Sequence, residues 1–194
     1  MRKLLPMIFM LILSTSAMAQ LSEADRDFAI RYLQATHNDI NNLVSDLTEE
    51  QWDHKPEDGG WSVANCLEHI LLTESAFLGM VQGTIQQSEA NPSLDLSAID
   101  GTLIGQFANR GTKVKTVDQF EPSGKWTTKQ EMLDELERSR TKLIEYLKTT
   151  DDDLRKYKIA LPGGQSDAYQ IFLLISAHSQ RHTFQMNEVL TELS

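Results

Sequence analysis

Apolar side chains recur every three or four positions along four long segments of this sequence. That spacing puts the apolar residues of each segment on one face of a helix, and it predicts four α-helices. The expected helices cover about residues 22–47, 62–87, 127–149 and 168 to nearly the C-terminus. Because the chain has hardly any β-strand signal, the pattern predicts an all-α fold.

Residues suited to capping stand at the start of three of these segments. Ser62 and Asp167 each have a side-chain oxygen that can accept a hydrogen bond from a free N–H group of the first helical turn. Thr128 is followed three residues later by Glu131, which is the pattern of a capping box. We therefore expect helices to begin at these points.

The connection between the second and third helices is long, from residue 88 to residue 126. It is rich in glycine and proline, and a short helix is expected near residues 98–109. Connections of this length are uncommon inside a compact domain and are often functional. Two interpretations stay open: the segment covers one mouth of the bundle, or it is a spacer. Either way, it predicts a four-helix bundle with a crossover that lets helices two and three run parallel.

The first nineteen residues have the layout of a secretory signal peptide. Arg2 and Lys3 precede a short apolar run, and the segment ends with Ala17-Met18-Ala19. The apolar run is about ten residues long, whereas a membrane span needs about 20. We predict a signal peptide over residues 1–19, a single domain over residues 20–194, and a periplasmic or secreted protein with no membrane attachment after cleavage.

The net charge limits the expected binding partners, and the cysteine content limits what can hold the fold together. The chain carries 18 basic and 28 acidic residues, for a net charge of −10. The negative electrostatic field of such a chain repels the phosphate backbone of nucleic acids, so nucleic acid is not expected as a partner. Cys66 is the one cysteine, so an internal disulfide is excluded. The fold must be held by its core, by a metal ion, or by both.

Two histidines interrupt the apolar stripe of the fourth helix. His178 and His182 occupy positions that continue the line of Ile171, Leu174 and Ile175. Because they are four residues apart, their rings stack one turn above the other and can reach one point in space. This spacing is typical of helical metal sites, although hydrogen-bonded core histidines would give the same pattern.

A metal site of this kind needs a third ligand, and His69 is the candidate. It lies on the flank of the second helix's apolar face, near Cys66 and Thr73. The pattern alone leaves open whether His69 faces the pair on the fourth helix or faces solvent.

The sequence resembles the DinB-like (YfiT-like) four-helix-bundle superfamily. The resemblance rests on Trp61-Ser62, on Glu68-His69-Ile70 and on the late run from Ala177 to Gln185, and it covers nearly the whole mature chain. It implies a bundle with the crossover described above, and a divalent metal, usually zinc or nickel, bound by His69, His178 and His182. It also implies a tendency to form homodimers, and thiol-dependent transferase or isomerase activity in some members. Export disfavours that activity, because low-molecular-weight thiols are not expected in the periplasm.

Several other residues are candidates for the site with a simpler alternative beside each. Cys66 could approach the metal or be a small buried residue, and Glu74 could act as a base or form an ion pair. Gln185 could orient a ligand or bond a neighbouring helix. His37 is a remote candidate for a fourth ligand, and His54 lies in an exposed loop.

Three neutral histidines leave coordination positions open, as catalytic metal sites do. The leading hypothesis is an exported metal-binding bundle that acts as a hydrolase or transferase on a small molecule. The alternatives are a non-catalytic bundle that binds metal or ligand, and a plain bundle with histidines in its core. The sequence identifies neither the substrate nor the catalytic residues.

Overall fold

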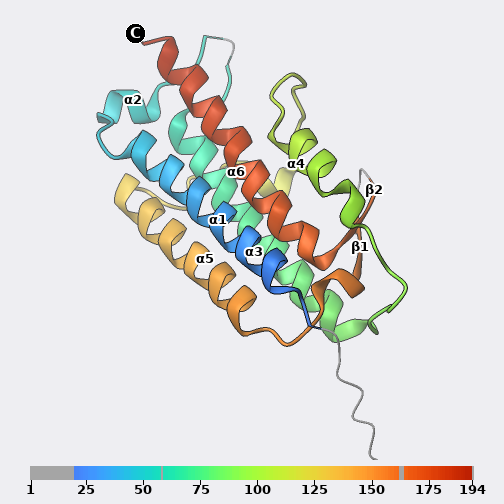
Figure 1. Ribbon diagram of the computed structural model, residues 1–194. Coiled ribbons are helices and arrows are strands. Elements are labelled where there is room, and N and C mark those ends of the chain that lie inside the picture. The colour runs from blue at the N-terminus through green and yellow to red at the C-terminus, as the bar shows by residue number, and fades with distance from the viewer. Residues whose placement is uncertain (1–19, 58, 162–163, 194) are drawn as a thin grey trace, which may run out of the picture.

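The computed structural model describes residues 20–57, 59–161 and 164–193, so the predicted signal peptide lies outside the described residues. Four long helices pack side by side (Figure 1). They are α1 (Glu23–Val44), α3 (Val63–Gln87), α5 (Lys129–Thr149) and α6 (Ala168–Thr191). Shorter elements connect them: helices α2 (Glu49–Asp53) and α4 (Asp100–Ala108), and the single turns η1 (Ser97–Ile99), η2 (Asp118–Phe120) and η3 (Leu154–Lys156). Within this part of the chain, no helix combines the length and the hydropathy that crossing a bilayer requires.

The predicted helix starts are confirmed. The side-chain oxygens of Ser62, Thr128 and Asp167 each accept a hydrogen bond from the backbone N–H three residues later. In all three cases the side chain of that later residue bonds back to the N–H of the cap, which completes a capping box. These reciprocal bonds satisfy donors that would otherwise be left free at a helix end.

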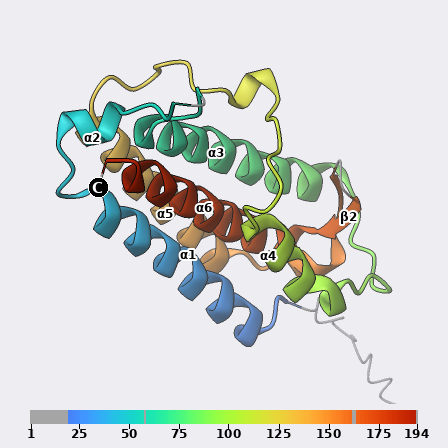
Figure 2. The same ribbon diagram turned by 90° about the horizontal axis from the view of Figure 1, so that it is seen from above.

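The crossover is also confirmed. Helices α3 and α5 run in the same direction, and α1 and α6 run opposite to them (Figure 1). The amino end of α5 therefore meets the carboxyl end of α1, where Lys129 Nζ donates to the carbonyl oxygens of Ser45 and Leu47 at 3.3 and 2.9 Å. The long connection carries α4, which packs along the outer side of α6 (Figure 2).

Helix α6 is enclosed by α1, α3 and α4, and most of its side chains are buried. An amphipathic helix buries one stripe, whereas this helix is covered on several sides. The histidines of α6 are therefore held in a rigid, central element of the fold.

A buried polar layer divides the apolar core into two clusters. Arg140 of α5 is 1% exposed and forms an ion pair of 2.7 Å with Glu74 of α3. The same guanidinium donates to Thr36 Oγ1 at 3.1 Å and to Ser179 Oγ at 2.6 Å, so one side chain joins all four long helices. The charged residues from Glu137 to Lys142 predict a solvated outer face of the third helix, and for Arg140 that prediction is wrong. Arg140 occupies the inner position between Leu136 and Leu143.

A two-stranded hairpin precedes α6, which the sequence pattern did not predict. Strands β1 (Lys158–Leu161) and β2 (Gly164–Asp167) pair antiparallel, with Ile159 opposite Ser166. Each strand has four residues, too few for a clear alternation of apolar and polar positions.

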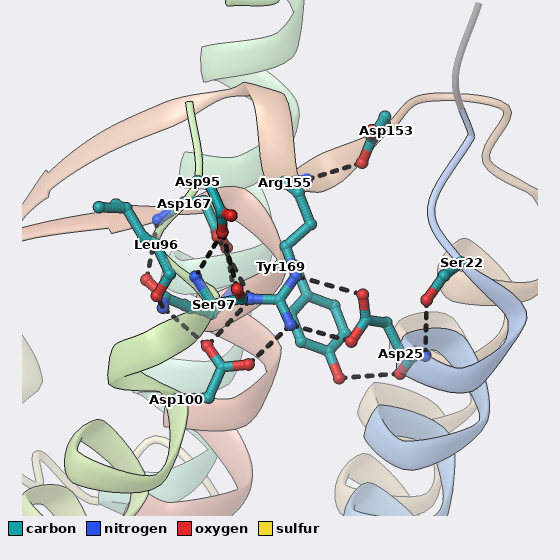
Figure 3. Close-up of polar contacts among 11 residues, drawn as sticks. Ser22, Asp25, Asp95, Leu96, Ser97, Asp100, Asp153, Arg155, Asp167 and Tyr169 are labelled. Atoms are coloured by element: carbon teal, nitrogen blue, oxygen red, sulfur yellow. Dashed lines mark hydrogen bonds and ion pairs between the residues drawn. The ribbon is translucent and has the colours of Figure 1, made fainter. Parts of the chain in front are cut away.

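Arg155 ties the long connection to the bundle (Figure 3). Its Nη2 atom donates to Asp25 of α1 at 2.9 Å and to Asp100 of α4 at 2.6 Å, and its Nη1 atom donates to Asp167 at 3.3 Å. The guanidinium also lies over the ring of Tyr169, 3.9 Å from the ring centroid. This cluster fixes the starts of α1, α4 and α6 relative to one another.

Candidate metal centre

The structure brings His69, His178 and His182 together. His69 projects from α3, and the other two project from successive turns of α6. The Nε2 atom of His178 lies 3.2 Å from Nε2 of His69 and 3.1 Å from Nε2 of His182. One ring nitrogen from each residue lies within 4.8 Å of the other two. His69 is 3% exposed, so the interpretation of a histidine that faces solvent is wrong.

The opposite nitrogen of each ring faces an oxygen atom. His69 Nδ1 lies 2.7 Å from the carbonyl oxygen of Phe120, and His182 Nδ1 lies 3.0 Å from Gln185 Oε1. His178 Nδ1 makes a longer contact of 3.5 Å with Thr73 Oγ1. A carbonyl oxygen can only accept, so Nδ1 of His69 carries the proton, and the same assignment suits the other two rings.

This tautomer leaves three Nε2 lone pairs directed toward a common point. Lone pairs at about 3 Å repel one another unless a positive charge lies between them. Outward Nδ1–H groups bonded to oxygen are also the usual support for histidines that bind metal through Nε2. The donor set therefore fits a divalent metal ion.

The surroundings keep these histidines neutral. Burial, together with the charges that His69 and Arg181 can carry, lowers the pKa of His178 to about 3. Burial also lowers the pKa of His69 and holds that of His182 well below its ordinary value. Neutral imidazole is the form that binds metals, so the rings are available as ligands at neutral pH.

Glu68, next to His69 in the sequence, anchors the loop that supplies the Phe120 carbonyl. Its carboxylate accepts hydrogen bonds from the N–H groups of Ser123, Gly124 and Lys125 at 2.9–3.1 Å and from the Ser123 hydroxyl at 3.1 Å. Burial opposes ionisation of this carboxyl, but these donors lower its pKa below the ordinary value. Sequence reasoning missed this role, because the partner atoms are mostly backbone groups of a loop.

The histidine cluster opens into a cleft of about 720 Å³. Trp61 forms part of its wall: the indole lies 4.8 Å from the ring of His69 and is stacked at 5.9 Å on the ring of His182, centroid to centroid. Phe77 and Phe107 add apolar wall. A metal ion at the histidines would therefore be reachable by a small molecule, as in catalytic rather than closed structural sites.

Two arginines, Arg110 and Arg181, also line the cleft. Arg110 pairs with Glu188 at 2.7 Å, and Arg181 donates to the carbonyl oxygen of Thr112. Burial lowers the pKa of Arg181, and the charge of Arg110 acts in the same direction. The two guanidiniums are thus close enough to affect each other.

Of the other candidate residues, one contacts the cluster of three histidines and the rest lie outside it. Gln185 contacts His182, as described above. Cys66 is fully buried outside the cluster, and burial raises the pKa of its thiol to about 12. Glu74 forms the ion pair with Arg140, as the simpler alternative proposed. His37 lies 3.4 Å from Glu137, and His54 lies 3.7 Å from Glu192, so neither joins the three histidines.

Comparison with known proteins identifies the family. A model of the DinB superfamily matches residues 32–186, so the chain belongs to the DinB superfamily. Among solved structures, it is similar to YfiT from Bacillus subtilis, with a TM-score of 0.60 and 18% sequence identity over 89% of this chain and 90% of that one. YfiT is described as a probable metal-dependent hydrolase with an unusual four-helix bundle topology. No curated protein matches the sequence. At this identity, the structural likeness supports the fold.

Proposed function

We propose that this protein is a metal-dependent hydrolase that acts on a small molecule and holds one divalent ion through His69, His178 and His182. One observation carries the proposal: three Nε2 atoms converge while each Nδ1 atom faces an oxygen acceptor. That arrangement costs free energy without a cation, because buried polar groups are stable only when they are paired. The description of YfiT supports the same class of activity.

Zinc or nickel is the proposed metal, since neutral imidazoles suit both ions. An ion with three histidine ligands and open positions lowers the pKa of water and polarises a carbonyl or phosphoryl oxygen.

The chain's own residues prepare the site for that chemistry. Phe120, Thr73 and Gln185 hold the three Nδ1 protons, so the rings cannot rotate freely. Trp61 and Phe77 cover the rings with apolar surface and exclude bulk water from that side. Because their pKa values are lowered, the histidines stay unprotonated and available at neutral pH.

Hydrolysis is tested with the mature chain, metal-free and then loaded with zinc or nickel, against a panel of small esters, amides and phosphate esters. The proposal predicts turnover that requires the metal and is lost in His178→Ala and His182→Ala. The variant His37→Ala is the matched control and should keep full activity, because His37 lies outside the cluster. Turnover that is equal with and without metal would refute the proposal.

Two other functions remain as alternatives to hydrolysis at the same centre. A transferase would use the cleft for a donor and an acceptor, and would show product formation only when both are supplied. A non-catalytic binding protein would retain metal in stoichiometric amount with no turnover of any substrate class. The open cleft favours an enzyme over a structural metal site.

We also propose that the protein is exported and acts in the periplasm or outside the cell. The support is the basic, apolar and small-residue pattern of residues 1–19. N-terminal sequencing of the protein from its host should begin at Gln20. An N-terminus at Met1 on a cytoplasmic protein would contradict export.

A further inference from the structure

Arg181 differs from the other buried arginine of the core in its partners. Arg140 is 1% exposed and is paired with Glu74 at 2.7 Å. Arg181 is 9% exposed, and within the described part of the chain its guanidinium donates one hydrogen bond, to the carbonyl oxygen of Thr112. Among the described residues, no carboxylate lies within ion-pair distance of Arg181. Buried charges are normally paired, because removing a charge from water is costly.

The position of Arg181 places this charge, which Glu188 balances only from beyond ion-pair distance, beside the three histidines. Arg181 precedes His182 on α6, and both side chains line the same cleft. Arg110 and Lys113 line the cleft as well, together with two carboxylates: Glu188, which pairs with Arg110, and Glu192. A divalent ion held by the three neutral histidines would add positive charge to the same cleft. This cleft therefore gathers positive charge on a protein whose net charge is −10.

The rest of the cleft is suited to an apolar group. Trp61, Phe77 and Phe107 supply aromatic wall, and the volume of about 720 Å³ is in the range of sites for small organic ligands. A ligand that matches both features has an apolar body and one anionic group.

We propose that Arg181 binds the anionic group of the substrate, a carboxylate or a phosphate-type group, and that the substrate is a small, partly apolar anion. This inference rests on the proposed function, because it assigns the substrate class of the same site. The guanidinium presents a fork of N–H donors that matches two oxygens of such a group. Arg110, which lines the same cleft, adds attraction.

The test measures binding of three probes to the metal-loaded mature chain by calorimetry. The probes are benzoate, phenylphosphonate and the neutral analogue benzamide. The proposal predicts that at least one anion binds at least about tenfold more tightly than benzamide, since a charge-assisted pair adds about that much affinity. The two anions together show whether the group is a carboxylate or a phosphate type.

Three variants test whether Arg181 causes the preference for the anionic probe. Arg181→Gln should abolish the preference for the anion while benzamide affinity and metal content stay unchanged. Arg181→Lys should keep part of the preference, because the charge remains and the fork is lost. Arg138→Gln is the matched control, an arginine on the exposed face of α5 that should behave as wild type.

The outcomes are distinct from those that test the metal site. One bound metal ion with equal affinity for anions and benzamide overturns this inference and leaves the metal proposal standing. A preference that survives unchanged in Arg181→Gln also overturns it, because the metal alone would then bind the anion. An Arg181-dependent preference in a chain that holds no metal supports this inference and refutes the metal proposal.

A second measurement covers the case in which Arg181→Gln does not fold. Phenylglyoxal modification of the wild-type chain, read by mass spectrometry, should be slowed at Arg181 by the preferred anion and not by benzamide. Equal protection by both probes would overturn the proposal.

Discussion

The Nδ1 atom of His69 lies 2.7 Å from the carbonyl oxygen of Phe120, although 50 residues separate the two positions in the chain. This hydrogen bond joins helix α3 to the long crossover, and it fixes the ring that faces α6. The crossover therefore does more than connect two helices: it orients one of the three histidines. The sequence left open a cover over one mouth of the bundle or a spacer, and this hydrogen bond gives the segment a contact that a spacer would not need.

The first prediction concerns Glu68, which holds the loop that follows Phe120. Glu68→Gln replaces one accepting carboxylate oxygen by an amide nitrogen, which can only donate and cannot accept from the loop's N–H groups. The Phe120 carbonyl should then hold His69 less firmly, and metal affinity should fall about 10- to 100-fold, as for other residues that support metal ligands. Competition with a chromophoric chelator measures the affinity.

Glu145→Gln is the control for this prediction, because Glu145 is an exposed residue of α5. It should bind metal as wild type does. If Glu68→Gln and Glu145→Gln have the same affinity, the loop does not position His69.

The second prediction concerns the buried pair of Glu74 and Arg140. Arg140→Met leaves the Glu74 carboxylate buried without its partner, and we expect a loss of about 3–5 kcal/mol in the free energy of unfolding. The double variant Arg140→Met/Glu74→Leu removes both charges and should recover most of that loss. Urea denaturation monitored by circular dichroism measures both effects.

An exposed ion pair on the same helix is the control for the loss of stability in this experiment. Arg138 and Glu135 form an ion pair on the exposed side of the same helix. Arg138→Met should change stability by less than about 1 kcal/mol, because exposed ion pairs contribute little. A loss for Arg140→Met no larger than that of Arg138→Met would contradict the role of the buried layer.

The third prediction is a pH dependence of the metal-free chain. The pKa of His178 is lowered from 6.5 to about 3 in the folded state, so the unfolded chain binds a proton first as the pH falls. The contribution of neutral His178 to the free energy of unfolding should therefore be fully present above pH 6.5. Below that pH the free energy of unfolding should decrease by up to about 1.4 kcal/mol per pH unit for each such histidine.

Comparison with His178→Leu isolates this effect. Asp167 has the opposite effect, because burial raises the pKa of its carboxyl from 3.8 to about 6 in the folded state. Its protonation therefore increases the free energy of unfolding as the pH falls below about 6. Both proteins share that contribution, so the difference between them reports on His178. Urea unfolding at pH 7.5, 6 and 5 should give a shallower decrease for His178→Leu. Parallel curves would show that His178 titrates normally in the fold.

Helix geometry explains which parts of this account could be predicted from the sequence. His178 and His182 are four residues apart, and the repeat of a helix alone brings them together. His69 is different, because it depends on how α3 packs against α6, and its place came from the family resemblance. Periodicity alone left it on the flank of a helix.

Arg140 shows a signal that was present and misinterpreted. Met132, Leu136, Leu143 and Leu147 leave a gap in the inner stripe of α5 that Arg140 fills, just as Glu74 fills a position on the apolar face of α3. Two opposite charges at core positions of neighbouring helices predict a buried pair. By contrast, the carbonyl of Phe120 could not have been found, since the direction of a backbone group in a loop has no sequence signature.

Metal analysis of the purified chain shows whether the three imidazoles share one divalent ion. The mature protein, loaded with zinc or nickel and dialysed, is measured by elemental mass spectrometry beside His69→Ala, His178→Ala, His182→Ala and the control His37→Ala. We expect about one ion per chain in the wild type and in His37→Ala, and almost none in the other three variants. Equal metal content in all five proteins, whether one ion or none, would contradict this expectation.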